Sequence, residues 1–112
     1  MRTTNARLLL LLPWLSAPLV AAAYLLLWDR IPERLAVHFT LAGEPDGWMS
    51  RGQSLAFDLG ILLFVLLTAT LQLYRRGQHE TPSRLAVFNG TVLFVTIIFL
   101  GLLKYNVSGS LF

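Results

Sequence analysis

The sequence contains no cysteine and few charged residues. Of its 112 residues, nine are Lys or Arg and six are Asp or Glu, so charged residues make up 13% of the chain and hydrophobic residues 55%. The absence of cysteine excludes a disulfide, a thiolate metal site and a cysteine nucleophile. A soluble domain carries roughly 25% charged residues. This deficit excludes an ordinary soluble domain and indicates a chain that lies in lipid, and at this length it forms at most one domain.

Three long apolar runs account for this composition. They cover residues 8–28, 55–74 and 85–103, and Asp58 is the only charged residue within them. Because a helix rises ~1.5 Å per residue, each run spans the ~30 Å hydrocarbon core of a bilayer. Three buried soluble helices would leave too little polar surface in so short a chain. We therefore expect an all-α membrane protein, a single integral domain over residues 1–112 with three transmembrane helices.

The first run has a second interpretation, as a signal peptide. Arg2 and Arg7 precede an apolar stretch, and the alanines at 21–23 offer a cleavage site. The run continues to Trp28, however, which is too long for the apolar region of a signal. We favour a retained helix, which Pro13 and Pro18 should kink.

The positions of Lys and Arg predict an orientation. Arg2 and Arg7 lie before the first run, and the segment 75–84 between the second and third runs carries Arg75, Arg76 and Arg84. The positive-inside rule puts both segments in the cytoplasm. The segment 29–54 and the C-terminus are then extracytoplasmic. We interpret Arg75 and Arg76 as determinants of this orientation and as contacts to anionic lipids.

Polar side chains within the runs form two seams. Asp58, Thr68 and Gln72 fall within an arc of about 80° on the second helix, and Asn89 and Thr96 share a face of the third. We expect both seams to face inward and to hold helices together by hydrogen bonds. A substrate or proton path would require several acids or histidines at mid-membrane depth, and the runs contain none.

Asp58 is predicted to find a base at its own end of the bundle. The second and third helices run antiparallel, which brings Asp58 and Lys104 to the same end. We expect the two side chains to lie within reach of each other, directly or through water. Arg51, one to two turns before Asp58, is the other candidate base.

The segment 29–54 combines a strand pattern with a turn. Leu35, Val37, Phe39 and Leu41 alternate with small or polar residues, which predicts a short strand. The sequence Glu-Pro-Asp-Gly at 44–47 predicts a type I turn. The strand could pair with the segment after the turn, with a second copy of the chain or with a bound peptide.

The apolar face of this strand is expected to pack onto the outer ends of the helices, because soluble surfaces avoid an exposed apolar stripe. Trp48 should then lie at the membrane interface, with the predicted turn as a rigid tip. His38 and Asp46 should point to one side of the loop, near Asp58.

The stretch WDRIPERLAVHFTLAGEPDGWMSRGQS, residues 28–54, resembles a short bacterial membrane module, domain of unknown function 1648. In that module a Pro-x-x-x-x-x-His-Phe-type element follows the first transmembrane helix, and a Gly-x-Pro-Asp element comes shortly after. The resemblance covers roughly residues 13–65 and leaves the third helix outside. The matching residues, which are the candidate functional residues of the loop, are Pro32, His38, Phe39, Gly43, Pro45, Asp46 and Gly47.

The resemblance implies a class of function. The module occurs at the N-terminal end of SdpI-like proteins, bacterial membrane proteins linked to immunity against a secreted toxin and to signalling through a sequestered repressor. It implies a non-enzymatic, multi-pass protein of the bacterial cytoplasmic (inner) membrane whose outer loop senses or binds an envelope ligand such as a peptide. The three helices expected here are fewer than in the longer SdpI-like proteins. The alternative is a structural accessory subunit that packs against a larger membrane partner such as a transporter. A homo-oligomer is the other form of partnership that the sequence leaves open.

Other chemistries have weaker support. His38, Glu44 and Asp46 could offer three metal ligands, but their spacing fits no standard motif. Nothing in the sequence couples Ser50 or Ser54 to a base, so neither is a favoured nucleophile. The chain has no basic patch interleaved with aromatic residues, which argues against nucleic-acid binding. We expect no cofactor, and we take the glycosylation pattern at residues 106–108 as coincidental.

Overall fold

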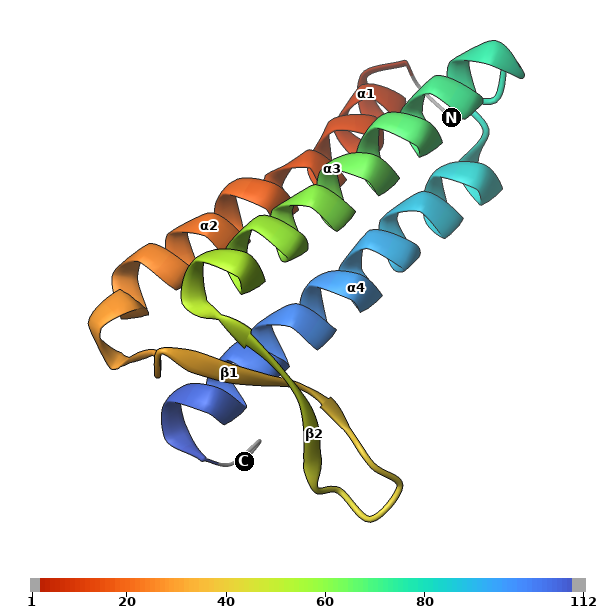
Figure 1. Ribbon diagram of the computed structural model, residues 1–112. Coiled ribbons are helices and arrows are strands. Elements are labelled where there is room, and N and C mark those ends of the chain that lie inside the picture. The colour runs from red at the N-terminus through yellow and green to blue at the C-terminus, as the bar shows by residue number, and fades with distance from the viewer. Residues whose placement is uncertain (1–2, 110–112) are drawn as a thin grey trace.

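The computed structural model describes residues 3–109, so that residues 1–2, which include Arg2, and residues 110–112 lie outside the described part. Three long helical rods lie side by side, and a two-stranded hairpin packs at one end of them (Figure 1). The first rod consists of α1 (Thr3–Leu11), η1 (Leu12–Leu15), α2 (Ser16–Leu27) and η2 (Trp28–Arg30). The hairpin strands β1 (Arg34–Phe39) and β2 (Pro45–Ser50) follow, and then the helices α3 (Arg51–Arg75) and α4 (Pro82–Ser108). We call the two ends of the bundle the hairpin end and, where residues 75–84 lie, the arginine end.

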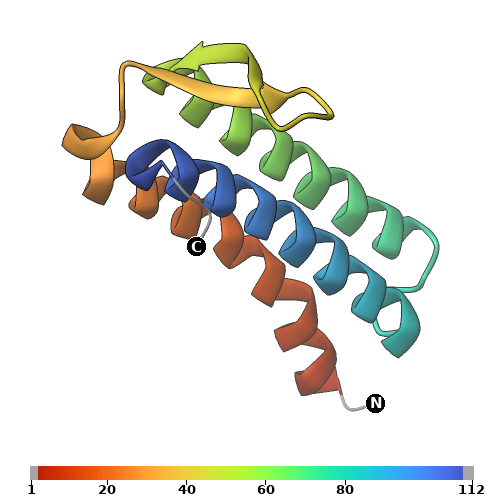
Figure 2. The same ribbon diagram turned by 90° about the horizontal axis from the view of Figure 1, so that it is seen from below.

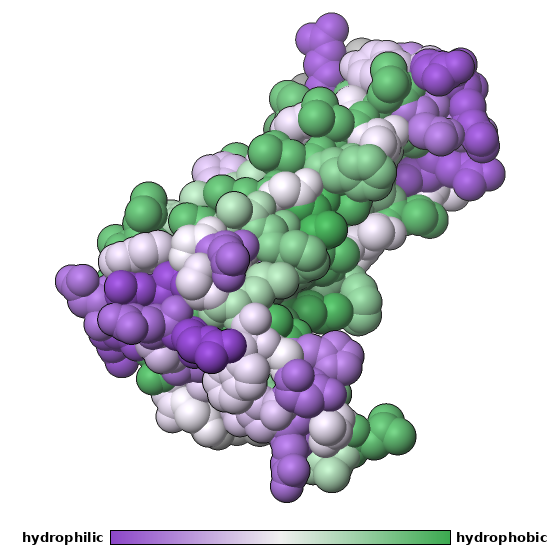
Figure 3. Space-filling view, viewed as in Figure 1, coloured by the Kyte–Doolittle hydropathy of each residue, from purple (hydrophilic) through white to green (hydrophobic). Residues whose placement is uncertain are grey.

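The three rods are long and apolar enough to cross a membrane. The candidate spans are Asn5–Arg30, Arg51–Arg75 and Pro82–Ser108, which confirms the three predicted helices by length and composition. Large apolar side chains such as Leu19, Phe64 and Phe94 are exposed around the middle of the bundle. Figure 3 shows this apolar band between two hydrophilic ends. The arrangement is that of a multi-pass membrane protein.

Two helices extend beyond the predicted runs: α3 begins earlier, at a capping box, and α4 continues to a C-cap glycine. Ser50 and Gln53 form a reciprocal capping box at the start of α3, in which Gln53 N–H donates to Ser50 Oγ and Ser50 N–H donates to Gln53 Oε1, each at 3.1 Å. This motif satisfies two of the unpaired donors of a helix start. At the other end of the chain, α4 continues to Ser108 and stops at Gly109, whose φ of 77° is left-handed.

Pro13 breaks the first rod as predicted. It lies in η1, and its missing N–H leaves the carbonyl of Leu9, four residues earlier, without the usual helical donor. The side chain of Asn89 on α4 supplies that donor, with Nδ2 2.8 Å from the Leu9 oxygen. Pro18 does not interrupt the helix, because it lies in the first turn of α2, where an N–H has no intrahelical acceptor.

The core runs along the line where the three rods meet. In α3 the buried positions recur every fourth residue from Ser54 through Asp58 and Leu62 to Leu66. Val20 and Tyr24 of the first rod pack against this line, together with a stripe on α4. The buried residues of α4 are Leu85, Phe88, Val92, Thr96, Phe99 and Leu103.

The predicted strand is one half of a hairpin. β1 pairs with β2 antiparallel, so the segment after the turn is its partner, and a bulge between Ala36 and His38 interrupts the register. The chain reverses through Leu41–Gly43: Thr40 N–H donates to Glu44 O at 2.8 Å, and Gly43 has a φ of 85°. A three-residue hairpin loop that ends on a left-handed glycine has this geometry. The predicted turn at residues 44–47 is therefore wrong, since Pro45–Gly47 already belong to β2.

Candidate functional site

The hairpin is held against the bundle by the side chain of Asn106, near the C-terminal end of α4. The Ala36 N–H donates to Asn106 Oδ1 at 2.7 Å, and Asn106 Nδ2 donates to the Ala36 oxygen at 2.9 Å. Nδ2 also donates to Leu102 O at 2.8 Å, which fixes the amide orientation. One side chain thus pairs with a strand residue as a neighbouring strand would, and β1 packs against α4 near its C-terminal end. Figure 2 shows the hairpin lying along one side of the helices at this end.

Two aromatic contacts extend this attachment. The ring of Phe39 meets that of Tyr105 edge-on, with centroids 5.3 Å apart. On the far side of the hairpin, Arg51 joins the start of α3 to the end of the first rod. Its guanidinium lies 4.9 Å from the centre of the Trp28 ring, and its Nη1 donates to the Trp28 oxygen at 3.0 Å.

Beneath the hairpin, three polar side chains from two rods form a buried chain of hydrogen bonds. Tyr24 Oη donates to Asp58 Oδ2 at 2.6 Å and lies 2.7 Å from Ser54 Oγ. A tyrosine has one hydroxyl hydrogen, so Ser54 must be the donor to Tyr24. Each of the three residues is at most 5% exposed. Burial of a carboxyl group is costly without such partners.

This chain lines a cavity of ≈ 210 Å³. Its walls are mostly apolar side chains of β1, α3 and α4, and its polar lining comes from Asn106 and the Tyr24–Ser54–Asp58 chain. Among the residues that the structure describes, none donates a hydrogen bond to the second carboxyl oxygen of Asp58. An apolar cavity with a few convergent polar groups is the usual form of a small-ligand site.

His38 and Asp46 come together on the exposed side of the hairpin, with 2.5 Å between Nδ1 and Oδ1. The side chains are 74% and 43% exposed. The prediction that they share one side of the loop is confirmed, whereas Asp58 is buried among other partners. Within residues 3–109 no group of three His, Cys, Asp or Glu side chains could hold a metal ion.

The other predicted loop residues shape the hairpin. Gly43 provides the left-handed turn residue, and Gly47 faces β1 so closely that a Cβ there would lie 2.8 Å from the Cβ of His38. Pro45 begins β2, and Pro32 is exposed between η2 and β1. Phe39 packs on Tyr105 as described.

The predicted alternation of the strand is wrong in part. Leu35 and Ala36 are both buried, and Val37 and Phe39 are half-buried. Leu41 is fully exposed at the hairpin tip. The bulge after Ala36 shifts the pattern, because an extra residue in one strand moves the following side chains to the other face.

The three residues of the predicted polar seam on α3 do not all face inward. Asp58 is on the buried stripe, but Thr68 and Gln72 lie beside it and are exposed. Thr68 donates within its own helix, to Phe64 O at 2.7 Å. On α4, Asn89 joins two rods, as expected for an interhelical contact, while the buried Thr96 donates to Val92 O at 2.7 Å.

Among the described residues, no direct ion pair joins Asp58 to Lys104, which is one form of the expected pairing. The partner of Asp58 is Tyr24, a residue of the first rod, and Lys104 is exposed on α4. A neutral hydroxyl satisfies the carboxyl group in the apolar interior without the desolvation of a second charge. Arg51 instead binds Trp28.

Sequence reasoning missed the two residues on which the site depends most. In the sequence, Tyr24 is one residue of an apolar run, and Asn106 stands out only as part of a glycosylation pattern. One signal was available for Tyr24: a buried acid in a transmembrane segment needs a donor at similar depth, and Tyr24 is the one tyrosine within the three runs that lies toward the same end. The partner of Asn106 is a backbone group 70 residues away, which no local pattern reveals.

Comparison with known proteins gives one family match. Residues 15–69 match the family described as a domain of unknown function (DUF1648). The matched segment contains α2, the hairpin and most of α3, including Tyr24, Ser54 and Asp58, but not Asn106. No curated protein and no solved structure matches the chain.

Proposed function

We propose that the chain is a non-enzymatic membrane protein of the SdpI-like type, in which the hairpin end binds a secreted peptide on the outer face of the bacterial cytoplasmic membrane. One observation carries the proposal. A hairpin clamped by Asn106 covers a cavity with an acid at its floor and apolar walls. The match of residues 15–69 to a family with no assigned activity is compatible with this role and names no ligand.

The cavity lining indicates the chemistry of the ligand. The free oxygen of Asp58 can accept a hydrogen bond from an amine or amide N–H. Leu35, Val37 and Phe99 offer a surface for an apolar side chain. A peptide carries an N–H donor and an apolar side chain close together. A peptide with at least one apolar residue near its amino terminus therefore suits the cavity.

The hairpin also offers backbone groups to a peptide. Because the N–H and oxygen of Ala36 point to Asn106, the pair of Ala36 with Trp48 is of the non-hydrogen-bonded kind. The N–H and oxygen of Trp48 therefore point away from β1, toward the open edge of β2. Pro45 has no N–H and Ser50 N–H is bound by Gln53, so this edge can bind only a short extended segment.

Survival of a bacterium that is sensitive to a secreted membrane-active peptide tests the proposal. Cells that express the chain should tolerate more peptide, and Asp58→Asn should remove this protection. Asp29→Asn is the matched control, because it removes the same charge from an exposed position at the same end. His38→Ala should change the protection while leaving the amount of protein in the membrane unchanged. Equal protection by both Asn variants would exclude the cavity as the binding site.

A second groove favours the alternative, a structural accessory subunit. It lies between the first rod and α4, has a volume of ≈ 290 Å³, and is lined by Pro13, Ser16 and Gly90 among others. The Ser16 hydroxyl is buried without a hydrogen-bond partner in the described residues. Small residues and an unpaired hydroxyl suit a further transmembrane helix. If Gly90→Leu released a membrane partner while Asp58→Asn had no effect, the accessory role would replace the peptide-binding role.

A further inference from the structure

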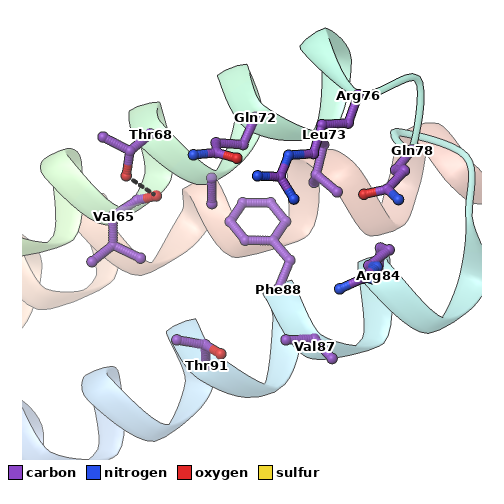
Figure 4. Close-up of a pocket in the computed structure, with 11 residues that line it drawn as sticks. Val65, Thr68, Gln72, Leu73, Arg76, Gln78, Arg84, Val87, Phe88 and Thr91 are labelled. Atoms are coloured by element: carbon purple, nitrogen blue, oxygen red, sulfur yellow. Dashed lines mark hydrogen bonds between the residues drawn. The ribbon is translucent and has the colours of Figure 1, made fainter.

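A third groove, at the arginine end, is independent of the hairpin and its proposed ligand. It lies between α3 and α4, has a volume of ≈ 370 Å³, and is lined on both sides by side chains of these two helices (Figure 4). Along α3 it extends from Val65 to the C-cap residue Arg76, which corresponds to about 16 Å. The groove thus begins at the end of a candidate membrane span and continues toward the middle of the bilayer.

The two halves of the groove differ in chemistry. At the arginine end its lining includes Arg76, Arg84 and Gln78, whereas Val65, Val87 and the ring of Phe88 line it farther along. In Figure 4 the Arg76 side chain extends over the groove from the end of α3, and the Phe88 ring projects from α4 toward α3. A cationic mouth therefore continues into a mostly apolar channel, whose polar lining includes Thr68 and Thr91.

The two arginines lack internal counter-charges. Both are exposed, and among residues 3–109 neither forms an ion pair with an acid. The nearest acid in the sequence is Glu80, which lines a different hollow together with Arg7, Tyr74 and His79. Planar guanidinium groups bind phosphate oxygens in two-point geometry, so the mouth has the charge and the donors for a phosphate group.

We propose that this groove is a binding site for one anionic phospholipid. The phosphate lies between Arg76 and Arg84, and one acyl chain follows the apolar half of the groove past Phe88. A soluble phosphate would use only the mouth. A lipid uses both halves, and the groove opens at the level where the span meets the headgroups, which is where lipid phosphates are concentrated.

Spin-labelled lipids can test the site in the full chain reconstituted into phosphatidylcholine bilayers. Spin-labelled phosphatidylglycerol should associate with the protein more strongly than spin-labelled phosphatidylcholine. Arg76→Gln and Arg84→Gln should each lower this preference about fivefold. Arg75→Gln is the matched control, because Arg75 has the same charge and is the neighbour of Arg76 but does not line the groove.

The apolar half of the site needs a separate variant. Val87→Phe puts a larger side chain at an exposed groove position without changing any charge, and it should lower the association of phosphatidylglycerol. Ile97→Phe, at an exposed position of α4 outside the groove, should leave it unchanged. Circular dichroism and the elution volume of each variant show whether it still folds.

Three results would overturn the proposal. If Arg75→Gln lowered the preference as much as Arg76→Gln, the attraction would be that of a basic surface without a site. If soluble glycerol phosphate at millimolar concentration displaced the lipid and Val87→Phe had no effect, the mouth would be a site for phosphate alone. If phosphatidylcholine associated as strongly as phosphatidylglycerol, the groove would not select an anion.

Discussion

The two ends of the bundle satisfy their polar groups in opposite ways. At the hairpin end the polar groups bind one another across long sequence separations, as Tyr24 does with Asp58 and Asn106 with Ala36. At the arginine end the cations are exposed, and no internal acid pairs with Arg76 or Arg84 in the described residues. At the hairpin end, the protein itself supplies the partners of these polar groups. At the arginine end, the partners of the two arginines must come from the surroundings.

This difference implies different sensitivities to substitution. An internal hydrogen bond at a buried site leaves an unsatisfied group behind when one partner is removed, and that group costs ~1–3 kcal/mol. An exposed arginine leaves nothing buried, and its removal should hardly change stability. Substitutions at the hairpin end should therefore act on folding, and those at the arginine end on association with lipid.

Asn106→Leu should have the largest effect. It removes the donor and the acceptor that hold Ala36, and leaves two backbone groups of a buried residue without partners. We expect a loss of about 3 kcal/mol in the free energy of unfolding in mild detergent. Thr68→Ala is the control: its hydroxyl binds only its own helix from an exposed position, and its loss should cost almost nothing. Similar losses of stability for the two variants would contradict the conclusion that Asn106 holds the hairpin against the bundle.

Tyr24→Phe should rank second. It keeps the ring but removes the hydroxyl that binds Asp58 and Ser54, with an expected loss of about 2 kcal/mol. If the cost comes from the orphaned carboxyl group, the double variant Tyr24→Phe/Asp58→Leu should recover most of it, since apolar packing can replace a buried polar pair. Additive losses in this double-mutant cycle would show that the two side chains do not interact.

Gly47→Val should loosen the hairpin by about 1.5 kcal/mol, because even a Cβ at this position would lie 2.8 Å from that of His38. The comparison is with Gly52→Ala in the first turn of α3, where a Cβ would meet nothing within 4 Å. That variant should be neutral or slightly stabilising. Thermal unfolding of the two variants distinguishes a steric requirement for glycine from a general loss of flexibility.

Asn89→Leu should cost the least, about 1 kcal/mol, as is usual for hydrogen bonds between transmembrane helices. The effect depends on Pro13, because that residue deprives Leu9 of its helical donor. In a Pro13→Ala background the new N–H can bind the Leu9 oxygen, and Asn89→Leu should then be nearly neutral. An undiminished cost in that background would mean that Asn89 acts through packing alone.

The sequence predicts the parts of this fold that follow from local patterns. The three apolar runs predict the helices, Pro13 predicts the break in the first rod, and the alternation around Val37 predicts a strand. The pattern 44–47 misplaces the turn, because Gly43 supplies the left-handed residue that a three-residue loop requires. The contacts that build the candidate site are not local: 34 residues separate Tyr24 from Asp58 and 70 separate Ala36 from Asn106. Their pairing is decided by how the rods pack.

Cysteine labelling tests most directly whether the hairpin packs against the helices at the hairpin end. The chain has no native cysteine, so single cysteines at positions 35, 36, 38 and 41 can each be reacted with a membrane-impermeant maleimide in reconstituted protein. Leu35 and Ala36 are buried, whereas His38 and Leu41 are exposed. Positions 35 and 36 should react slowly, positions 38 and 41 quickly, and Asn106→Leu should speed up the reaction at position 36. Equal rates at all four positions would show a free tether and would contradict the docked hairpin.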